Sequence, residues 1–315
     1  MSTLSRPPDT HRHAADPGTR ALDLVGARID EVVAAATTHG GEPYLVGSLA
    51  ARLGDSWSDI DVHVVCAGAP PVSGPVFAST SEGTCVDIRY VRRSSIDRTL
   101  AGHDSRPPKG RAWTLSRWLN SVPLIEGAPP LLTDPERDRA RTLLVTSLLA
   151  DLVSLTSFAT LAEHAGAPRA WYLCRRAGIA AWELAATLKG QDYLGERWLI
   201  ARSSDPEVAA FAETAAPVQQ TGELDLLLDR LGIPGTEAPG RVRLLPNPEA
   251  ERWTLGGRPK ALVAGRRLVP QIDPVPETVA DAFKHCPAAA FAALADGALR
   301  WKVDVAGLTP RLGAA

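Results

Sequence analysis

The chain has few cysteines, and those it has are scattered. Four cysteines occur in 315 residues, and no two of them stand in a Cys-x-x-Cys spacing. This pattern excludes the common structural zinc sites and a disulfide framework, because both need closely spaced cysteine pairs. Scattered thiols are typical of a reducing compartment, so the sequence predicts a cytoplasmic location.

An excess of charge of one sign is also missing. Lys and Arg number 34, Asp and Glu number 36, and the formal net charge is −2. Such a balance gives the chain no overall attraction to nucleic acid or to an anionic membrane. A nucleic-acid partner is compatible with the sequence but not favoured by it, and no membrane partner is expected.

Long runs of purely apolar residues are absent as well. The most apolar stretch, 142–162, carries the single charge Asp151, and Ser and Thr recur throughout it. Its leucines fall at helical spacing, which predicts a central helix of a bundle rather than a membrane span. Residues 1–19 also lack an apolar centre, and we expect a disordered leader there rather than a signal peptide.

The most informative stretch present is a Gly-Ser turn followed by two carboxylates. Gly47-Ser48 comes after a short apolar strand, and Asp59 and Asp61 lie ten residues further on, at the start of a second apolar strand. Side chains alternate along a strand, so the two aspartates point to one face. Mg²⁺ is held by one or two such carboxylates together with phosphates, and a glycine lets backbone N–H groups approach a phosphate.

A third carboxylate strengthens this interpretation. The segment 84–91 alternates and is rich in β-branched residues, which predicts a strand with Asp87 in its middle. Three carboxylates from neighbouring strands suit two metal ions in an in-line phosphoryl or nucleotidyl transfer. The pattern therefore points to chemistry on a nucleoside triphosphate.

In this arrangement the sequence resembles the DNA polymerase β-like nucleotidyltransferase superfamily, and it is most similar to the antibiotic-type and minimal nucleotidyltransferases of bacteria. The resemblance covers roughly residues 20–95, and its most specific motifs are Gly47-Ser48 and Asp59-Ile60-Asp61. It implies that Gly47 and Ser48 bind the β- and γ-phosphates. It also implies that Asp59, Asp61 and Asp87 bind two Mg²⁺ ions, with Asp87 helping to activate the attacking hydroxyl.

The predicted organisation is α+β. After the leader we expect a mixed-sheet catalytic domain over 20–112, with an opening helix at 20–38, and a helical domain over 113–231. A linker at 232–240 and a small α+β, winged-helix-like module over 241–315 complete the chain. A basic hairpin in this module, with four Lys and Arg residues beside Trp253, is interpreted as solvated, with contact to RNA as the alternative.

The helical domain resembles the one that follows the catalytic domain in antibiotic nucleotidyltransferases, and we expect it to help form the cleft. Tyr172, Arg176 and Glu183 fall on one stripe of a helix over 168–189. Arg176 and Lys189 are candidate phosphate ligands, and Glu183 is a candidate general base. The alternative is an ordinary ion-pair stripe, and Lys189 is favoured at a helix end by the dipole alone.

Taken together, the sequence predicts a Mg²⁺-dependent nucleotidyltransferase that moves AMP from ATP onto a hydroxyl of a small molecule and releases pyrophosphate. Two alternatives stay open. One is nucleotidylation of a protein or of a tRNA end, and the other is a non-catalytic nucleotide-binding or regulatory protein that retains the fold.

Overall fold

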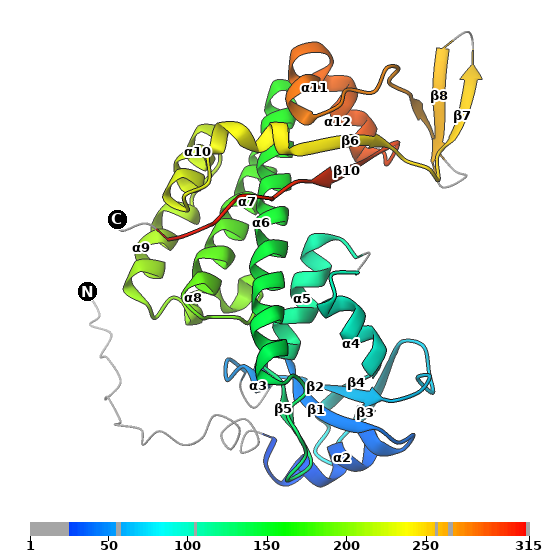
Figure 1. Cartoon of the computed structure of the whole chain (residues 1–315), viewed down its shortest axis with the longest axis vertical. Coiled ribbons are helices and arrows are strands. Elements are labelled where there is room, and N and C mark those ends of the chain that lie inside the picture. Colours follow the sequence, from blue (N-terminus) through cyan, green and yellow to red (C-terminus); the bar gives the residue numbers. More distant parts are fainter. Residues whose placement is uncertain (1–24, 55–57, 104–105, 256–257, 264–266, 313–315) are drawn as a thin grey trace. The chain divides into compact units, whose positions relative to one another are not determined.

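The computed structural model describes residues 25–54, 58–103, 106–255, 258–263 and 267–312. These residues form two compact units (Figure 1). The first unit comprises the chain up to Asp97 together with Asn120–Leu131, and the second comprises Arg98–Leu119 together with the chain from Leu132 onward. The sequence predicted a helical domain and a separate C-terminal module, whereas the structure groups both in the second unit.

The first unit is built on a mixed five-stranded sheet of order β3-β4-β2-β1-β5. Its strands β2 and β4 run parallel, and every other neighbouring pair is antiparallel. The predicted α+β class with a mixed sheet followed by helices is thus confirmed. The strands are β1 (Glu42–Val46), β2 (Ile60–Cys66), β3 (Pro75–Ser79), β4 (Cys85–Arg92) and β5 (Val122–Pro123).

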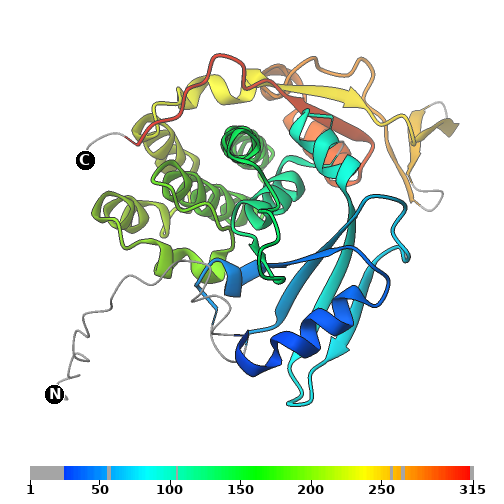
Figure 2. The same ribbon diagram turned by 60° about the horizontal axis from the view of Figure 1, so that its bottom comes forward.

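Strict alternation gives this sheet one apolar face. Leu45, Val62 and Ile88 point to the core, as do their neighbours two residues along each strand. Helix α2 (Ile29–Thr37) adds Val32 and Ala36 to the same core, and it lies along one face of the sheet in Figure 2. The other side chains of β2 and β4 therefore occupy the opposite face, where the candidate site is found.

The second unit is organised around the long helix α6 (Asp134–His164), which contacts α5 (Pro108–Leu119) and α7 (Ala170–Leu188). A capping box begins α6: Thr133 N–H donates to Glu136 at 2.8 Å, and Pro135 occupies the first turn. The buried hydroxyls of α6 donate to carbonyls one turn earlier, for example Ser154 to Ala150 at 2.7 Å. These bonds satisfy several hydroxyls that the burial of the helix removes from water, although the buried Thr156 hydroxyl has no partner among the described residues.

Helix α6 is the one helix of the described residues that is long and apolar enough to cross a membrane. Of its most apolar window, 61% is buried inside the unit. This burial agrees with the prediction of a central bundle helix. The core helix of a globular unit can be as long and as apolar as a membrane-spanning helix.

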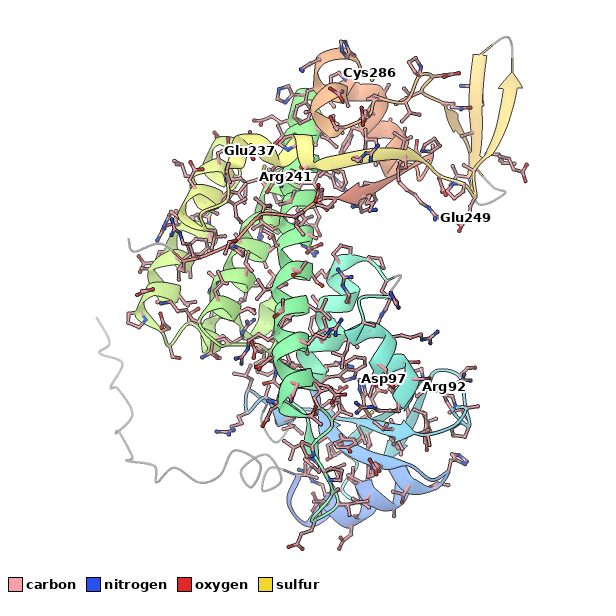
Figure 3. All side chains as sticks on the ribbon, viewed as in Figure 1. Arg92, Asp97, Glu237, Arg241, Glu249 and Cys286 are labelled. Atoms are coloured by element: carbon pink, nitrogen blue, oxygen red, sulfur yellow. The ribbon has the colours of Figure 1, made fainter. Side chains whose placement is uncertain are left out.

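Shorter helices complete the bundle. They are η2 (Glu196–Trp198), α8 (Leu199–Arg202), α9 (Pro206–Ala215), α10 (Thr221–Arg230) and η3 (Gly235–Arg241). The sequence predicted a linker over 232–240, but the structure has the 3-10 helix η3 there, packed on α6 and α10. Its Arg241 forms an ion pair of 3.2 Å with Glu237, both labelled in Figure 3.

The last part of the chain has two small sheets and two helices. The strands β6 (Val242–Pro246) and β10 (Leu299–Val303) pair antiparallel, and β7 (Glu251–Leu255), β8 (Arg258–Val263) and β9 (Arg267–Pro270) form a separate sheet. Helices α11 (Val279–His285) and α12 (Pro287–Ala295) join at Cys286, labelled in Figure 3, and pack on α6. The predicted strands and helices of this module are thus present.

Elsewhere the predicted boundaries shift. The helix predicted over 20–38 is described as η1 (Gly26–Arg28) and α2, with residues 20–24 outside the described range. Helix α5 begins at Pro108, where proline suits a first turn, and therefore crosses the predicted domain boundary at residue 112.

Candidate functional site

The candidate site lies on the polar face of the first sheet. Asp61 and His63 of β2 stand opposite Asp87 and Arg89 of β4 in the parallel register, and Val46 of β1 stands opposite Asp61. Residues paired across neighbouring strands point to the same face. Two of the three carboxylates that the sequence analysis selected, Asp61 and Asp87, are therefore direct neighbours on this face.

Gly47 brings the turn into direct contact with Asp61. Its φ of +78° lies in the left-handed region, which favours glycine. A Cβ added to Gly47 would lie 2.2 Å from Asp61 Oδ2, so any side chain there would displace the carboxylate. The glycine of the motif is thus required twice, once by its backbone conformation and once by the close approach of Asp61.

Ser48 lies in the short helix α3 (Gly47–Ala50) and is nearly buried. Its carbonyl accepts the N–H groups of Leu53 and Gly54, each at 2.9 Å, which folds the following loop back onto it. A Cβ added to Gly54 would lie 2.9 Å from Ser48 Oγ. Gly54 is therefore a second glycine of the turn, and the sequence analysis did not single it out.

Asp59 directly precedes β2 and is exposed, two residues before the half-buried Asp61. Within the described residues, no group of three or more His, Cys, Asp or Glu side chains is close enough to hold a metal ion. The structure thus brings Asp61 and Asp87 together, and it leaves Asp59 outside a compact triad. The neighbouring segment 55–57 lies outside the described residues.

Arg89 is a part of the site that the sequence analysis missed. Its guanidinium Nη2 donates to Asp87 Oδ2 at 3.1 Å, and Asp87 is the more buried partner. Arg89 follows Asp87 by two residues, and the alternation that placed Asp59 with Asp61 also predicts this pairing. The Arg89 guanidinium neutralises the charge of Asp87. It is also suited to bind a phosphate instead of Asp87, because guanidinium donates to both kinds of oxygen.

The residues of this face fit a magnesium ion with phosphates. Two adjacent carboxylates are enough for Mg²⁺, which keeps waters and substrate phosphates as its remaining ligands. The Gly47 backbone carries no side chain and lies directly against Asp61, so the N–H groups of the turn and the carboxylate are close enough to bind one phosphate and its metal ion. Asp61 and Asp87 are the residues that would hold the ion, with Asp59 at the rim.

The predicted residues of the helical domain have partners within the second unit. Glu183 is 2% exposed, and its carboxylate accepts the N–H of Gly195 at 3.1 Å. Lys189 forms an ion pair with Glu207 at the start of α9, and this bond raises the pKa of Lys189. Their proposed roles as base and phosphate ligand stay predictions, and the burial of Glu183 favours a structural role.

A buried carboxylate that the sequence analysis did not select lies beside Glu183. Burial raises the pKa of Asp151, opposed by the charges of Lys109 and Arg176 and reinforced by that of Glu183. Its Oδ2 is buried and has no hydrogen-bond partner among the described residues. Arg202 also interacts electrostatically with Glu183, and burial lowers its pKa to about 10. Arg176 and Glu183 of the predicted stripe therefore belong to a group of interacting charges, whereas Tyr172 is 48% exposed.

The basic hairpin of the C-terminal module lies largely outside what the structure describes. Strands β7 and β8 pair with Trp253 opposite Lys260, but residues 256–257 and 264–266 fall outside the described ranges. Its proposed contact with RNA stays a prediction.

No family model and no curated protein matches the chain. Among solved structures, the chain is similar to a nucleotidyltransferase-like protein from Exiguobacterium sibiricum, with a TM-score of 0.32 and 15% sequence identity. The alignment covers 67% of this chain and 77% of that chain. A likeness at this level carries no argument, so the proposal below depends on the geometry of the site.

Proposed function

We propose that the chain is a Mg²⁺-dependent nucleotidyltransferase that moves AMP from ATP onto a hydroxyl of a small molecule. The observation that carries this proposal is the contact of Asp61 with Gly47, together with the register that pairs Asp61 with Asp87. This arrangement joins a glycine turn suited to phosphate with two carboxylates suited to Mg²⁺.

In the proposed reaction, the acceptor oxygen bonds to the α-phosphorus and the bond to the bridging oxygen of the β-phosphate breaks, so pyrophosphate leaves. A bound Mg²⁺ would neutralise the charge that develops on the phosphates. Gly47 and Ser48 bind the β- and γ-phosphates through backbone N–H groups and a hydroxyl. Asp87 accepts the proton of the acceptor hydroxyl.

The experiment compares magnesium-dependent ATP binding and transfer in three variants. We expect Asp61→Asn and Asp87→Asn each to weaken binding of ATP with Mg²⁺ by about tenfold or more, because a metal ligand is lost. Asp97→Asn is the control, since Asp97 is an exposed aspartate of the same unit, paired with Arg93 at 3.1 Å. Calorimetry with Mg²⁺ and with EDTA measures binding, and transfer of α-phosphate label to a panel of acceptors measures activity.

Two results would contradict the proposal. One is that the unaltered protein binds none of the four triphosphates in the presence of Mg²⁺. The other is that Asp61→Asn and Asp97→Asn bind ATP equally well.

A non-catalytic nucleotide-binding protein is the second candidate. The ion pair of Arg89 with Asp87 favours it, because the third carboxylate of the pattern is neutralised by a neighbour on its own strand. Magnesium-dependent ATP binding without transfer to any acceptor would favour this candidate. Arg89→Gln separates the two, since the free Asp87 carboxylate then strengthens Mg²⁺ binding in both cases but raises transfer only in an enzyme.

A further inference from the structure

The first turn of α7 carries a pair of exposed aromatic side chains. Trp171 is 49% exposed and Tyr172 is 48% exposed, and their rings meet edge to face with centroids 6.0 Å apart. Half-exposed aromatic side chains are costly to leave in water, and together they form a surface suited to stacking. The rest of α7 buries its apolar side chains, so the first turn departs from the pattern of the helix.

Basic side chains surround the two rings. Arg175 follows Trp171 by one helical turn, and Arg176 follows Tyr172 in the same way. Arg169 precedes both rings. Neither Arg169 nor Arg175 makes an ion pair or a side-chain hydrogen bond with the described residues, and both are exposed. Arg176 is half-buried and interacts electrostatically with Asp151.

A neighbouring helix adds to this positive charge. The His164 ring at the end of α6 stacks on Phe283 of α11, with centroids 4.9 Å apart and planes at 10°. This stacking brings the last turn of α11, with the exposed Lys284 and His285, beside the end of α6. The basic side chains therefore come from two helices rather than from one.

The acidic side chains at this end of the unit are occupied by local hydrogen bonds. Glu223 accepts the N–H groups of Gln219 and Gln220 at 2.8 and 3.0 Å, and these bonds lower its pKa. Asp281 accepts the Thr278 hydroxyl at 2.8 Å, and Glu163 accepts the hydroxyl of Thr221. Glu223 and Asp281 cap helices and Glu163 holds a hydroxyl, and none of the three forms an ion pair with the arginines among the described residues.

We propose that this surface, formed by Arg169, Trp171, Tyr172, Arg175 and Lys284, binds single-stranded nucleic acid. Bases stack on exposed aromatic rings, and arginine and lysine contact the phosphates that link them. Its two aromatic rings and two arginines lie within two helical turns at the start of α7. It goes beyond the proposed nucleotidyl transfer and is independent of it, because every residue involved lies in the second unit.

The test uses the full chain and single strands of about 12 nucleotides, as RNA and as DNA, labelled with fluorescein. Binding is followed by fluorescence anisotropy in EDTA without triphosphate, so that the site at Asp61 does not contribute. We expect Trp171→Ala and Tyr172→Ala each to weaken binding by about tenfold, as expected for the loss of one stacked base. The double variant Arg169→Gln, Arg175→Gln should lower the salt slope by about 1.4, because two phosphate contacts are lost.

Controls come from comparable exposed side chains elsewhere. Phe77 is 67% exposed on β3, and Arg92 is exposed at the end of β4, so Phe77→Ala and Arg92→Gln should leave binding unchanged. Circular dichroism verifies that each variant is folded. Stronger binding of RNA than of DNA, or the reverse, identifies which strand the surface prefers, and either supports the proposal.

Three results would overturn it. The first is no binding of either strand at about 50 mM salt, where phosphate contacts are strongest. The second is equal binding by the aromatic variants and the unaltered protein. The third is binding of polyglutamate as tight as that of the oligonucleotides, which would identify an acidic protein as the partner. The effect of Asp61→Asn on ATP binding bears only on the proposed nucleotidyl transfer. It does not change the expected binding of oligonucleotides to the surface at the start of α7.

Discussion

At the scale of single residues, the candidate site depends on a glycine, Gly47, at a position where no side chain fits. Gly47 has room for Asp61 only because it lacks a Cβ, and Asp61 in turn lies opposite Asp87. The Gly-Ser and Asp-x-Asp halves of the motif, ten residues apart in sequence, are thus one contact in space. A substitution at the glycine therefore also displaces the Asp61 carboxylate.

Gly47→Ala should lower the free energy of unfolding by about 3 kcal/mol or more, from the left-handed backbone together with the collision with Asp61. Gly40→Ala is a matched control, because Gly40 has φ of +76° but no atom within 4 Å of an added Cβ. The control should lose only the backbone cost of about 1–2 kcal/mol. Urea unfolding measures both values, and equal losses would show that the contact with Asp61 adds nothing.

Asp151→Asn should stabilise the protein at about pH 7, by about 1 kcal/mol, because a buried carboxylate oxygen without a partner is replaced by a neutral group. Burial raises the pKa of Asp151 in the folded state. The folded state therefore binds the proton more tightly than the unfolded state, and the free energy of unfolding falls as pH rises through the window between the two pKa values.

The advantage of Asp151→Asn should consequently shrink as pH is lowered toward about 4, where Asp151 is protonated in the unaltered protein. Asp138→Asn, at an exposed position of α6, should change stability little at either pH. An advantage that stays constant over this range would mean that Asp151 does not titrate with folding.

At the scale of elements, α6 shows how a helix with little amphipathic character is fixed in place. Its many hydroxyls bond back to its own carbonyls, and its start is set by the Thr133 and Glu136 capping box. Arg137, in the same first turn, donates to the carbonyl of Leu119 at 2.8 Å and ties α6 to the end of α5. The position of the helix thus depends on its polar first turn as much as on its apolar side chains.

Thr133→Ala should cost about 1 kcal/mol, because the N-cap of a long buried helix is lost. Thr142→Ala is the control on the same helix, since the Thr142 hydroxyl is exposed and only bonds back to Asp138 at 3.0 Å. The control should stay within about 0.5 kcal/mol of the unaltered protein. Guanidinium unfolding compares the two, and equal losses would argue against the cap.

The elements show why some of the fold was predictable and some was not. Alternation and β-branched residues predicted β2 and β4, but the register that places Asp61 opposite Asp87 is set by the pairing of the strands. Strand β5 has two residues, one of them Pro123, and pairs only because β1 offers a free edge. The burial of Asp151 and Glu183 could likewise not be predicted from the sequence, because it depends on the packing of α5 and α7 against α6.

At the scale of the whole molecule, the two units are interleaved along the chain. The chain passes between them after Asp97, after Leu119 and after Leu131. The segment 120–131 supplies β5 and the core residue Leu124 to the first unit. A division at residue 112, as the sequence predicted, falls inside α5 and removes this segment from the sheet.

A fragment of residues 20–112 should therefore unfold at lower urea concentration than a fragment of residues 20–131, because it lacks β5 and Leu124. Circular dichroism and amide chemical-shift dispersion measure the difference. If both fragments unfold at the same concentration, β5 contributes nothing to the stability of the first unit.

The late position of β5 in the sequence also has a consequence for synthesis. A ribosome that adds about 5–20 residues per second completes β1 and then needs roughly 4–15 seconds to reach Val122. During that interval the β1 edge of the emerging sheet has no strand to cover it, while the Gly47-Ser48 turn that follows β1 has already been made. The candidate site residues are thus synthesised before β5 can pair with β1. We expect chaperones to bind the uncovered edge of β1 during that interval.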